Sequence, residues 1–287
     1  MNLQALFEKH NFHPKKHWGQ NFLIDENIRH KIIKAADLQR DDTIIEIGPG
    51  FGVLSEGILK KAKRVIAIEK DKRLVEILKD RFGDFPNLEI INKDILKVDF
   101  RDLKLAKETK VIGNLPYYIT TPIIFHLFKQ KGVIDFILIT VQKEVGERLT
   151  AKPGNKNYGI LSVKAKFFSQ PRVVFKISAK SFFPVPKVDS CLVKLDIYKE
   201  KKYSVQDEEA FFEIIEAAFS QRRKTIVNCL TSNFSLSKDL GKKLLRDTNI
   251  DFKRRGETLT LEEFIKLSKN FAEIRVSPER NHGFKNR

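Results

Sequence analysis

Strand-like and helix-like segments alternate from Asp25 to about Tyr198, and this alternation constrains the fold more than any other feature of the chain. Such alternation is typical of an open, mostly parallel sheet with helices on both faces. The predicted strands are Thr43–Ile47, Arg64–Ile68, Leu88–Asn92, Lys110–Gly113 and Asp135–Val141. The predicted helices are Asp25–Ala36, Val53–Ala62, Lys72–Arg81, Thr121–Phe128 and Lys143–Leu149, with Asp25 and Thr121 as N-caps.

The pattern changes after two closely spaced apolar runs, Arg172–Ile177 and Ser190–Ile197, which we expect to pair as an antiparallel edge hairpin. A charged stretch at 199–202 then marks a linker. Beyond it the apolar spacing is helical throughout, and Thr260 with Glu263 forms a capping box for the last helix. We therefore expect an α/β domain with a basic N-terminal arm over 1–198 and a smaller all-helical domain over 204–271. The basic segment 272–287 has few apolar residues, so we expect a flexible tail.

The charge balance points to a polyanionic partner. Lys and Arg number 54 against 37 Asp and Glu, which gives a net charge of +17 and a pI near 9.7. RNA, DNA and an anionic membrane all fit this balance. A membrane is disfavoured because no apolar run approaches the roughly 20 residues of a spanning helix. The N-terminus lacks the apolar core of a secretory signal, and Cys191 and Cys229 form no CxxC. We expect a cytoplasmic monomer.

The segment Asn114-Leu115-Pro116-Tyr117 follows a predicted strand and contains groups suited to methylating an exocyclic amine of a nucleobase. Such an amine is a poor nucleophile because its lone pair is delocalised into the ring. The Asn114 side-chain carbonyl and a main-chain carbonyl could accept its two N–H bonds and localise that pair. Tyr117 offers a flat face for a base drawn out of its stack. On these four residues alone, an ordinary strand exit with a core tyrosine is equally consistent.

A second site is predicted at the ends of the earlier strands. The first strand ends in a glycine loop, Gly48-Pro49-Gly50-Phe51-Gly52, which lets a ligand approach the main chain. Its spacing differs from that of dinucleotide folds, and Pro49 removes an amide that could face an anion, so a ligand without phosphate fits better. Glu69, about 20 residues further on, can accept from ribose hydroxyls, and Asp94 can accept from an adenine amino group. Methyltransferases that use S-adenosylmethionine show this combination.

Short basic groups far apart in sequence are candidates for phosphate contacts. The predicted RNA-binding residues are Lys15, Lys16, Arg222, Arg223 and Lys224, with a further group at Lys253–Arg255. His10, His13 and His17 lack a Cys or acidic partner in their segment, so no metal site is predicted.

Several motifs stand in the order found in the bacterial small-subunit ribosomal RNA adenine dimethyltransferases, and the chain resembles that family over nearly its whole length. Besides the glycine loop and Asn114–Tyr117, they are Gly19-Gln20-Asn21-Phe22-Leu23, Gln142–Val145, Tyr158–Val163, Phe182–Val188 and Gln221–Thr225. The resemblance implies a Rossmann-like methyltransferase domain followed by a helical RNA-binding domain. It also implies dimethylation, with S-adenosylmethionine, at N6 of two adjacent adenines in the 3′-terminal hairpin loop of 16S rRNA in the immature small subunit.

The same resemblance assigns roles to individual residues. Cofactor contacts are expected from Asn21, Leu23, Gly48, Glu69, Asp94 and Asn114. Tyr117 and Phe182 are expected to sandwich the target adenine, with Asn114 and the Leu115 carbonyl holding its amine. Phe183 departs from the family pattern because that position is often small and polar. Two alternatives stay open: a 23S rRNA dimethyltransferase of the macrolide-resistance type, and a non-catalytic ribosome assembly factor on the same fold.

Overall fold

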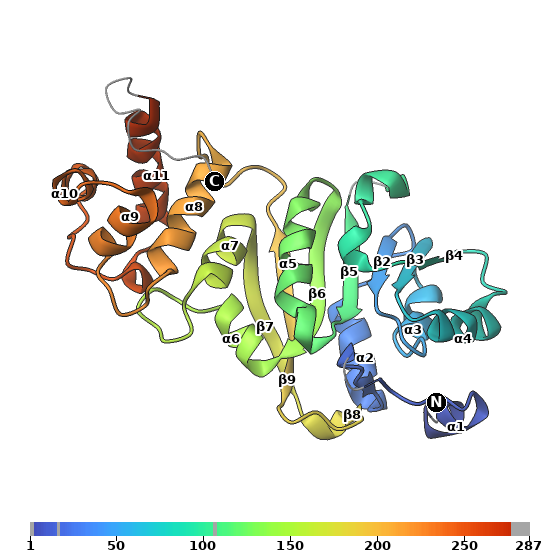
Figure 1. Cartoon of the computed structure of the whole chain (residues 1–287). Coiled ribbons are helices and arrows are strands. Elements are labelled where there is room, and N and C mark those ends of the chain that lie inside the picture. The colour runs from blue at the N-terminus through green and yellow to red at the C-terminus, as the bar shows by residue number, and fades with distance from the viewer. Residues whose placement is uncertain (1–2, 16–17, 106–107, 277–287) are drawn as a thin grey trace. The chain divides into compact units, whose positions relative to one another are not determined.

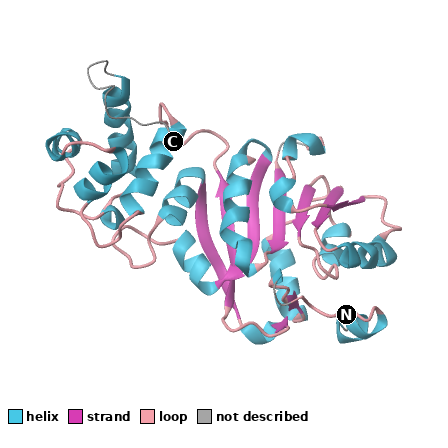
Figure 2. Cartoon of the chain, viewed as in Figure 1, coloured by secondary structure: helices cyan, strands magenta, loops and turns pink. Residues whose placement is uncertain are grey.

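The computed structural model describes residues 3–15, 18–105 and 108–276. Contacts between Cα atoms divide the chain into two units. The first comprises Met1–Glu147 and Phe168–Lys199, and the second comprises Arg148–Phe167 and Glu200–Arg287. Strands occur in the first unit, whereas the second is helical over its described residues (Figure 2).

The first unit is built on a seven-stranded sheet with the order β4-β3-β2-β5-β6-β9-β7 (Figure 1). The strands are β2 (Thr43–Ile47), β3 (Arg64–Glu69), β4 (Leu88–Asn92), β5 (Thr109–Asn114), β6 (Ile134–Gln142), β7 (Ser169–Ile177) and β9 (Ser190–Ile197). Strands β2 to β6 are parallel, and β9 pairs antiparallel with both β6 and β7. The predicted parallel sheet and its antiparallel edge hairpin are therefore confirmed.

The strand order reverses beside β2, and this reversal positions the site. The chain passes from β2 outward to β3 and β4, then returns to place β5 on the other side of β2. Ile47, at the end of β2, pairs with Ile68 on one side and Gly113 on the other. Ligands of such sheets bind where the order reverses, outside the carboxyl ends of the strands. Gly48 and Asn114 follow directly at that point.

The strand interiors are buried on both faces, as expected for a sheet covered by helices. Figure 1 shows α4 and α5 alongside the strands that they connect. The helices up to the linker are α1 (Leu3–Lys9), α2 (Glu26–Ala35), α3 (Ser55–Leu59), α4 (Lys72–Phe82), α5 (Thr120–Lys129), α6 (Lys143–Leu149) and α7 (Ile160–Phe168).

The first residues of α2 and α5 test the two predicted N-caps. Asp25 caps α2 as predicted, because its side chain accepts a hydrogen bond from the Ile28 amide at 3.1 Å. The prediction that Thr121 caps α5 was wrong. The helix begins at Thr120, directly after a 3₁₀ turn at Tyr117–Ile119, and has no side-chain cap. The Thr120 hydroxyl instead donates to the Pro116 carbonyl at 3.1 Å.

A two-stranded sheet ties the N-terminal segment to the body of the first unit. β1 (Phe22–Leu23) pairs antiparallel with β8 (Phe182–Phe183). The rings of Phe7 and Phe22 pack edge-on against Phe51 of the glycine loop, with centroids 4.9 and 5.1 Å away. Such aromatic pairs add to the stabilisation from buried area. The segment before β2 is thus fixed against the glycine loop.

The second unit contains α8 (Glu208–Phe219), α9 (Ile226–Phe234), α10 (Lys238–Asp247) and α11 (Leu261–Val276). The capping box is confirmed: the Thr260 amide donates to Glu263 at 2.8 Å, and the Glu263 amide donates to Thr260 Oγ1 at 3.2 Å. Helix α11 continues five residues into the segment expected as a tail, and 277–287 lie outside the described residues.

Residues 148–167 group with these helices, although the sequence pattern assigns them to the α/β domain. The Tyr158 hydroxyl donates to the Leu259 carbonyl at 2.9 Å in a buried position. The Phe167 ring lies 4.9 Å from that of Phe211. These contacts explain the grouping.

Two further features of the described residues bear on function. None of the helices within 3–15, 18–105 and 108–276 combines the length and apolar character needed to cross a membrane. Over the same ranges, no three His, Cys, Asp or Glu side chains form a group that could hold a metal ion.

Candidate active site

A pocket opens at the carboxyl edge of the sheet, where the strand order reverses. It encloses about 770 Å³ when the open solvent at its mouth is included. Its lining includes seven of the residues predicted from sequence: Asn21, Gly48, Glu69, Asp94, Asn114, Leu115 and Tyr117. Four consecutive strand ends therefore converge on one pocket.

The glycine loop brings main chain to the pocket wall. Gly48 and Gly50 have φ values of +63° and +60°, a conformation that L side chains rarely adopt. A Cβ atom on Gly50 would lie 3.0 Å from the Phe22 ring, and one on Gly48 would lie 3.7 Å from the Asn114 carbonyl. Glycine at these positions keeps the wall open for a ligand.

Glu69 has a fixed carboxylate at the end of β3. Oε1 accepts from the Asp71 amide at 2.8 Å, and Oε2 accepts from the Gly50 amide at 3.2 Å. These bonds orient the group and leave lone pairs for ligand hydroxyls. Burial raises the pKa of Glu69 to about 7, because the amide hydrogen bonds only partly offset the loss of water. A pair of ribose hydroxyls fits this acceptor.

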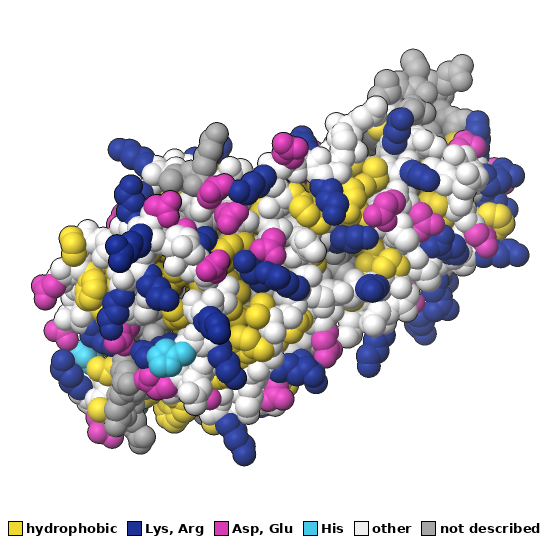
Figure 3. Space-filling model, turned by 180° about the vertical axis from the view of Figure 1, so that it is seen from behind, with side chains coloured by type: hydrophobic (Ala, Val, Ile, Leu, Met, Phe, Trp, Pro, Cys, Tyr) yellow, Lys and Arg dark blue, Asp and Glu magenta, His cyan; other side chains and the backbone are white. Residues whose placement is uncertain are grey.

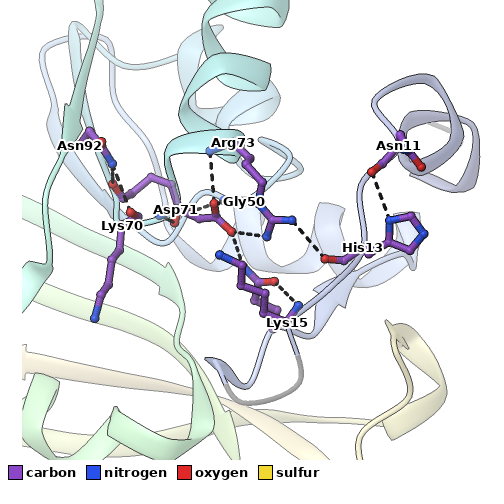
Figure 4. Close-up of polar contacts among 10 residues, drawn as sticks. Asn11, His13, Lys15, Gly50, Lys70, Asp71, Arg73 and Asn92 are labelled. Atoms are coloured by element: carbon purple, nitrogen blue, oxygen red, sulfur yellow. Dashed lines mark hydrogen bonds and ion pairs between the residues drawn. The ribbon is translucent and has the colours of Figure 1, made fainter.

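The N-terminal segment is fastened to the same strand end through Asp71 (Figure 4). Asp71 accepts from Gln20 Nε2 at 3.1 Å and from Arg73 at 2.6 Å, and the Lys15 amide donates to Gln20 Oε1 at 2.7 Å. The Arg73 guanidinium also donates to the His13 carbonyl at 3.4 Å. The wall formed by residues 18–22 is therefore held by charge-assisted hydrogen bonds.

Asp94 is the acidic group beyond β4, and it is paired with Lys70. Asp94 Oδ2 lies 2.8 Å from Lys70 Nζ, and Oδ1 accepts from the Leu96 amide at 3.1 Å. Burial acts to raise the pKa of Asp94, but the bonds from Lys70 and Leu96 outweigh it and hold the pKa below its usual value. Lys70 extends away from Asp71 and Arg73 (Figure 4), and its Nζ lies 5.7 Å from the centroid of the Trp18 ring. An ionised acceptor suits an adenine amino group.

Asn114 is held so that its side-chain oxygen faces no donor among the described residues. Its Nδ2 donates to the Asn21 carbonyl at 2.8 Å, and this contact assigns the orientation of the amide. The Leu115 amide donates to the Thr140 carbonyl at 3.2 Å, whereas the Leu115 carbonyl accepts no hydrogen bond from the described residues. Two acceptors, Asn114 Oδ1 and the Leu115 carbonyl, are therefore available in adjacent residues that both line the pocket.

Tyr117 lies in the 3₁₀ turn after β5 and is half-buried. Its hydroxyl is 2.6 Å from Ser190 Oγ, at the start of β9 and two strands away in the sheet. Ser190 is fully buried, and burial raises the pKa of Tyr117. This hydrogen bond fixes the ring at the mouth of the pocket.

Leu23 and Phe182, both expected at the site, do not line the pocket. They face each other across the β1–β8 pair and are 4 % and 0 % exposed, respectively. Neither ring face of Phe182 is available to a base, because the side chain packs in the hydrophobic core. Its neighbour Phe183 is 46 % exposed, and the centroid of its ring lies 5.3 Å from that of Phe7. We therefore leave Leu23 and Phe182 out of the site.

The predicted RNA-binding residues fall in different settings. Lys15 Nζ lies 4.1 Å from the centroid of the Trp18 ring, and Lys16 is outside the described residues. In the second unit, Arg222 is exposed but forms an ion pair with Glu257 at 3.1 Å. Arg223 and Lys224 are exposed.

Sequence reasoning missed several residues that line the pocket, including Trp18, Lys70 and Tyr118. It also missed Ser190, which holds Tyr117 from outside the pocket lining. Lys70 could have been found from its position directly after Glu69. Ser190 carries no such signal, because only the sheet brings it to Tyr117.

Comparison with known proteins agrees with this geometry. The family model described as ribosomal RNA adenine dimethylase matches residues 11–267. A protein of Alkaliphilus metalliredigens named ribosomal RNA small subunit methyltransferase A is 45 % identical over 94 % of this chain and 96 % of its own length. A Clostridium perfringens protein of the same name is 46 % identical over 92 % of this chain and 93 % of its own.

Solved structures show the same fold. A dimethyladenosine transferase from Plasmodium falciparum has a TM-score of 0.75 and 28 % identity, covering 88 % of this chain and 98 % of that one. The 23S rRNA methyltransferase ErmE has a TM-score of 0.68 and 24 % identity over 88 % of this chain and 99 % of its own, which supports the fold alone. The matched family model and the full-length relatives together show that the chain belongs to the ribosomal RNA adenine dimethylase family.

Proposed function

We propose that the chain transfers methyl groups from S-adenosylmethionine to N6 of two adjacent adenines in the 3′-terminal hairpin loop of 16S rRNA. The products are N6,N6-dimethyladenines and S-adenosylhomocysteine, and the substrate is the immature small ribosomal subunit. This specificity rests on the names of the full-length relatives and on the motif order. The orientation of Asn114 is the structural observation that carries the chemistry.

The pocket residues fit S-adenosylmethionine. Gly48 and Gly50 allow close approach to the main chain, Glu69 suits the ribose hydroxyls, and Asp94 suits the adenine amino group. The sulfonium of bound S-adenosylmethionine would supply an electron-poor methyl group. Because the ligand carries no phosphate, Pro49 removes no amide that the ligand would need.

The protein residues act on the target amine. Asn114 Oδ1 and the Leu115 carbonyl accept its two N–H bonds, which draws the lone pair out of the ring and aims it. Tyr117 supports the base by stacking, with its ring fixed through Ser190. No side chain has to act as a strong base, because an alkylated adenine amine loses its proton readily to water. Catalysis is then mainly positioning and charge placement.

Asn114→Ala tests this chemistry, with Asn27→Ala as the control because Asn27 is an exposed amide on α2. Purified protein and labelled cofactor are incubated with unmethylated small subunits, and the modified bases are mapped. Asn114→Ala should abolish methyl transfer while leaving small-subunit binding nearly unchanged, and Asn27→Ala should match the wild type. Full activity of Asn114→Ala would refute the catalytic role. Modification of 23S rRNA by the wild type would refute the substrate, and absence of any modification would favour an assembly factor.

A further inference from the structure

The loop between β8 and β9 exposes apolar side chains beside the active site. Phe183, Val185 and Val188 are 46 %, 61 % and 46 % exposed, and Ile24 on the neighbouring strand end is 44 % exposed. Ile24 belongs to the same surface because its amide donates to the Ser181 carbonyl at 2.9 Å. Grouped exposed apolar side chains of this size mark interaction sites more often than scattered ones do. We call residues 183–188 the apolar loop.

Both ends of the apolar loop are attached to the groups that hold the catalytic residues. At its start, Phe183 pairs with Phe22, which directly follows the Asn21 carbonyl that holds Asn114. Just past its end, Ser190 bonds the Tyr117 hydroxyl at 2.6 Å. Ser190 pairs with Gln142 at the carboxyl end of β6, so the loop lies at the pocket edge of the sheet, beside α2 (Figure 1).

The loop is stiff and is flanked by positive charge. Pro184 and Pro186 restrict its main chain, so little conformational entropy is lost when it makes contacts. Lys180 and Lys187 are exposed, and neither side chain forms a hydrogen bond or ion pair within the described part of the chain. The nearby carboxylate of Asp189 is engaged, because it accepts from the Ala179 amide at 3.0 Å. Apolar side chains between free cations suit unpaired nucleotides, whose bases stack and whose phosphates attract lysine. Lys and Arg side chains also outnumber acidic ones over the face in Figure 3.

We propose that the apolar loop, through Phe183 and Val185, contacts unpaired nucleobases that flank the target adenine in the hairpin loop. When a base leaves its stack, its neighbours lose a stacking partner, and apolar side chains can replace that contact. Lys180 and Lys187 neutralise the adjoining phosphates. The inference rests on the proposed function, and it adds a binding surface to the acceptors that perform the chemistry.

The test separates apolar from electrostatic contacts. The variant Phe183→Ser/Val185→Ser removes the apolar surface, and Lys180→Gln/Lys187→Gln removes the charges. Val173→Ser/Val174→Ser is the matched control, because both valines are 39 % exposed on the edge strand β7 and lie away from the loop. Affinity for unmethylated small subunits is measured at several salt concentrations, and dimethyl sulfate reports the accessibility of the hairpin bases.

The apolar variant should weaken binding at least about fivefold at every salt concentration without changing the salt slope, since stacking releases no counterions. It should also expose the bases beside the target adenine that the wild type protects. The lysine variant should reduce the salt slope by roughly 2. S-adenosylhomocysteine binding should be unchanged in both variants.

Three results would overturn the proposal. The first is an unchanged affinity of the apolar variant for small subunits, and the second is an equal loss of affinity in the valine control. The third is that the apolar variant still protects the hairpin bases from dimethyl sulfate and loses only contacts to a ribosomal protein. These results leave the proposed function standing if the wild type still methylates the two adenines. Failure of methylation by the wild type would instead overturn the function itself.

Discussion

Replacing Glu69 with Gln should change folding stability in a way that depends on pH. Burial raises the pKa of Glu69 from 4.5 to about 7. The folded state therefore binds this proton more tightly than the unfolded state, and stability falls as pH rises from below 4.5 to above 7. With these pKa values, the free-energy cost of ionising the buried group is about 1 kcal/mol at pH 5 and about 3 kcal/mol at pH 8.

Gln carries no charge at either pH, so Glu69→Gln escapes this cost. It also loses one of the two acceptors that face the Gly50 and Asp71 amides, a penalty of about 1–3 kcal/mol at every pH. The free energy of unfolding of the variant, relative to the wild type, should therefore rise by about 2 kcal/mol from pH 5 to pH 8. Burial also raises the pKa of Glu46 to about 7, and repulsion from Glu69 contributes to that rise. The pH-dependent difference therefore contains the direct effect of Glu69 and a smaller effect through Glu46.

The measurement is urea unfolding followed by fluorescence of Trp18, the one tryptophan of the chain, which reports on the first unit. Glu89→Gln is the control, because Glu89 is exposed and paired with Arg64 on the surface. The variant should also bind S-adenosylhomocysteine more weakly, since ribose hydroxyls lose an anionic acceptor. A stability difference that stays constant from pH 5 to pH 8 would refute the reasoning.

Three further predictions concern the pocket and the basic surface. Gly50→Ala places a Cβ 3.0 Å from Phe22 at a φ of +60°, so it should lower the free energy of unfolding by about 1–2 kcal/mol and weaken cofactor binding. Gly132→Ala, with nothing within 4 Å, should leave both properties unchanged. Lys70→Met should raise KM for S-adenosylmethionine with little change in kcat, because Asp94 loses its partner. Lys129→Met, at an exposed position in the last turn of α5, should not raise KM; equal KM values for the two variants would contradict this. Arg223→Glu/Lys224→Glu should weaken RNA binding and reduce its salt slope by at least roughly 2, and an unaltered slope would exclude the pair from the RNA-binding surface.

The sheet and the strand-end part of the site could be predicted because they depend on local pattern. Apolar runs bounded by polar or glycine residues fix where β2 and β4 begin and end, and both match their predicted ranges. Parallel strands then bring Gly48, Glu69, Asp94 and Asn114 to one edge without further information.

Packing between distant segments could not be predicted in this way. Residues 148–167 fall within the range predicted for the first domain, but contacts such as that of Tyr158 with Leu259, 101 residues away, group them with the second unit. The start of α5 was missed for a different, local reason. A 3₁₀ turn precedes the helix, and the Thr120 hydroxyl bonds the Pro116 carbonyl, so Thr120 is already part of the helix.

Phe182 and Phe183 show the limit most clearly, because the family resemblance identifies the motif but not the side of the strand that each ring occupies. Two consecutive residues of a strand point to opposite faces, and a strand as short as β8 has no periodicity from which the faces can be assigned. In the pair with β1, Phe182 lies opposite Leu23 and is fully buried, whereas Phe183 lies opposite Phe22 and is 46 % exposed. Because β1 follows the Asn21 carbonyl that orients Asn114, the same short pairing sets both the exposed aromatic and the catalytic acceptor. Any substitution that shifts this register by one residue should therefore impair RNA contact and methyl transfer together.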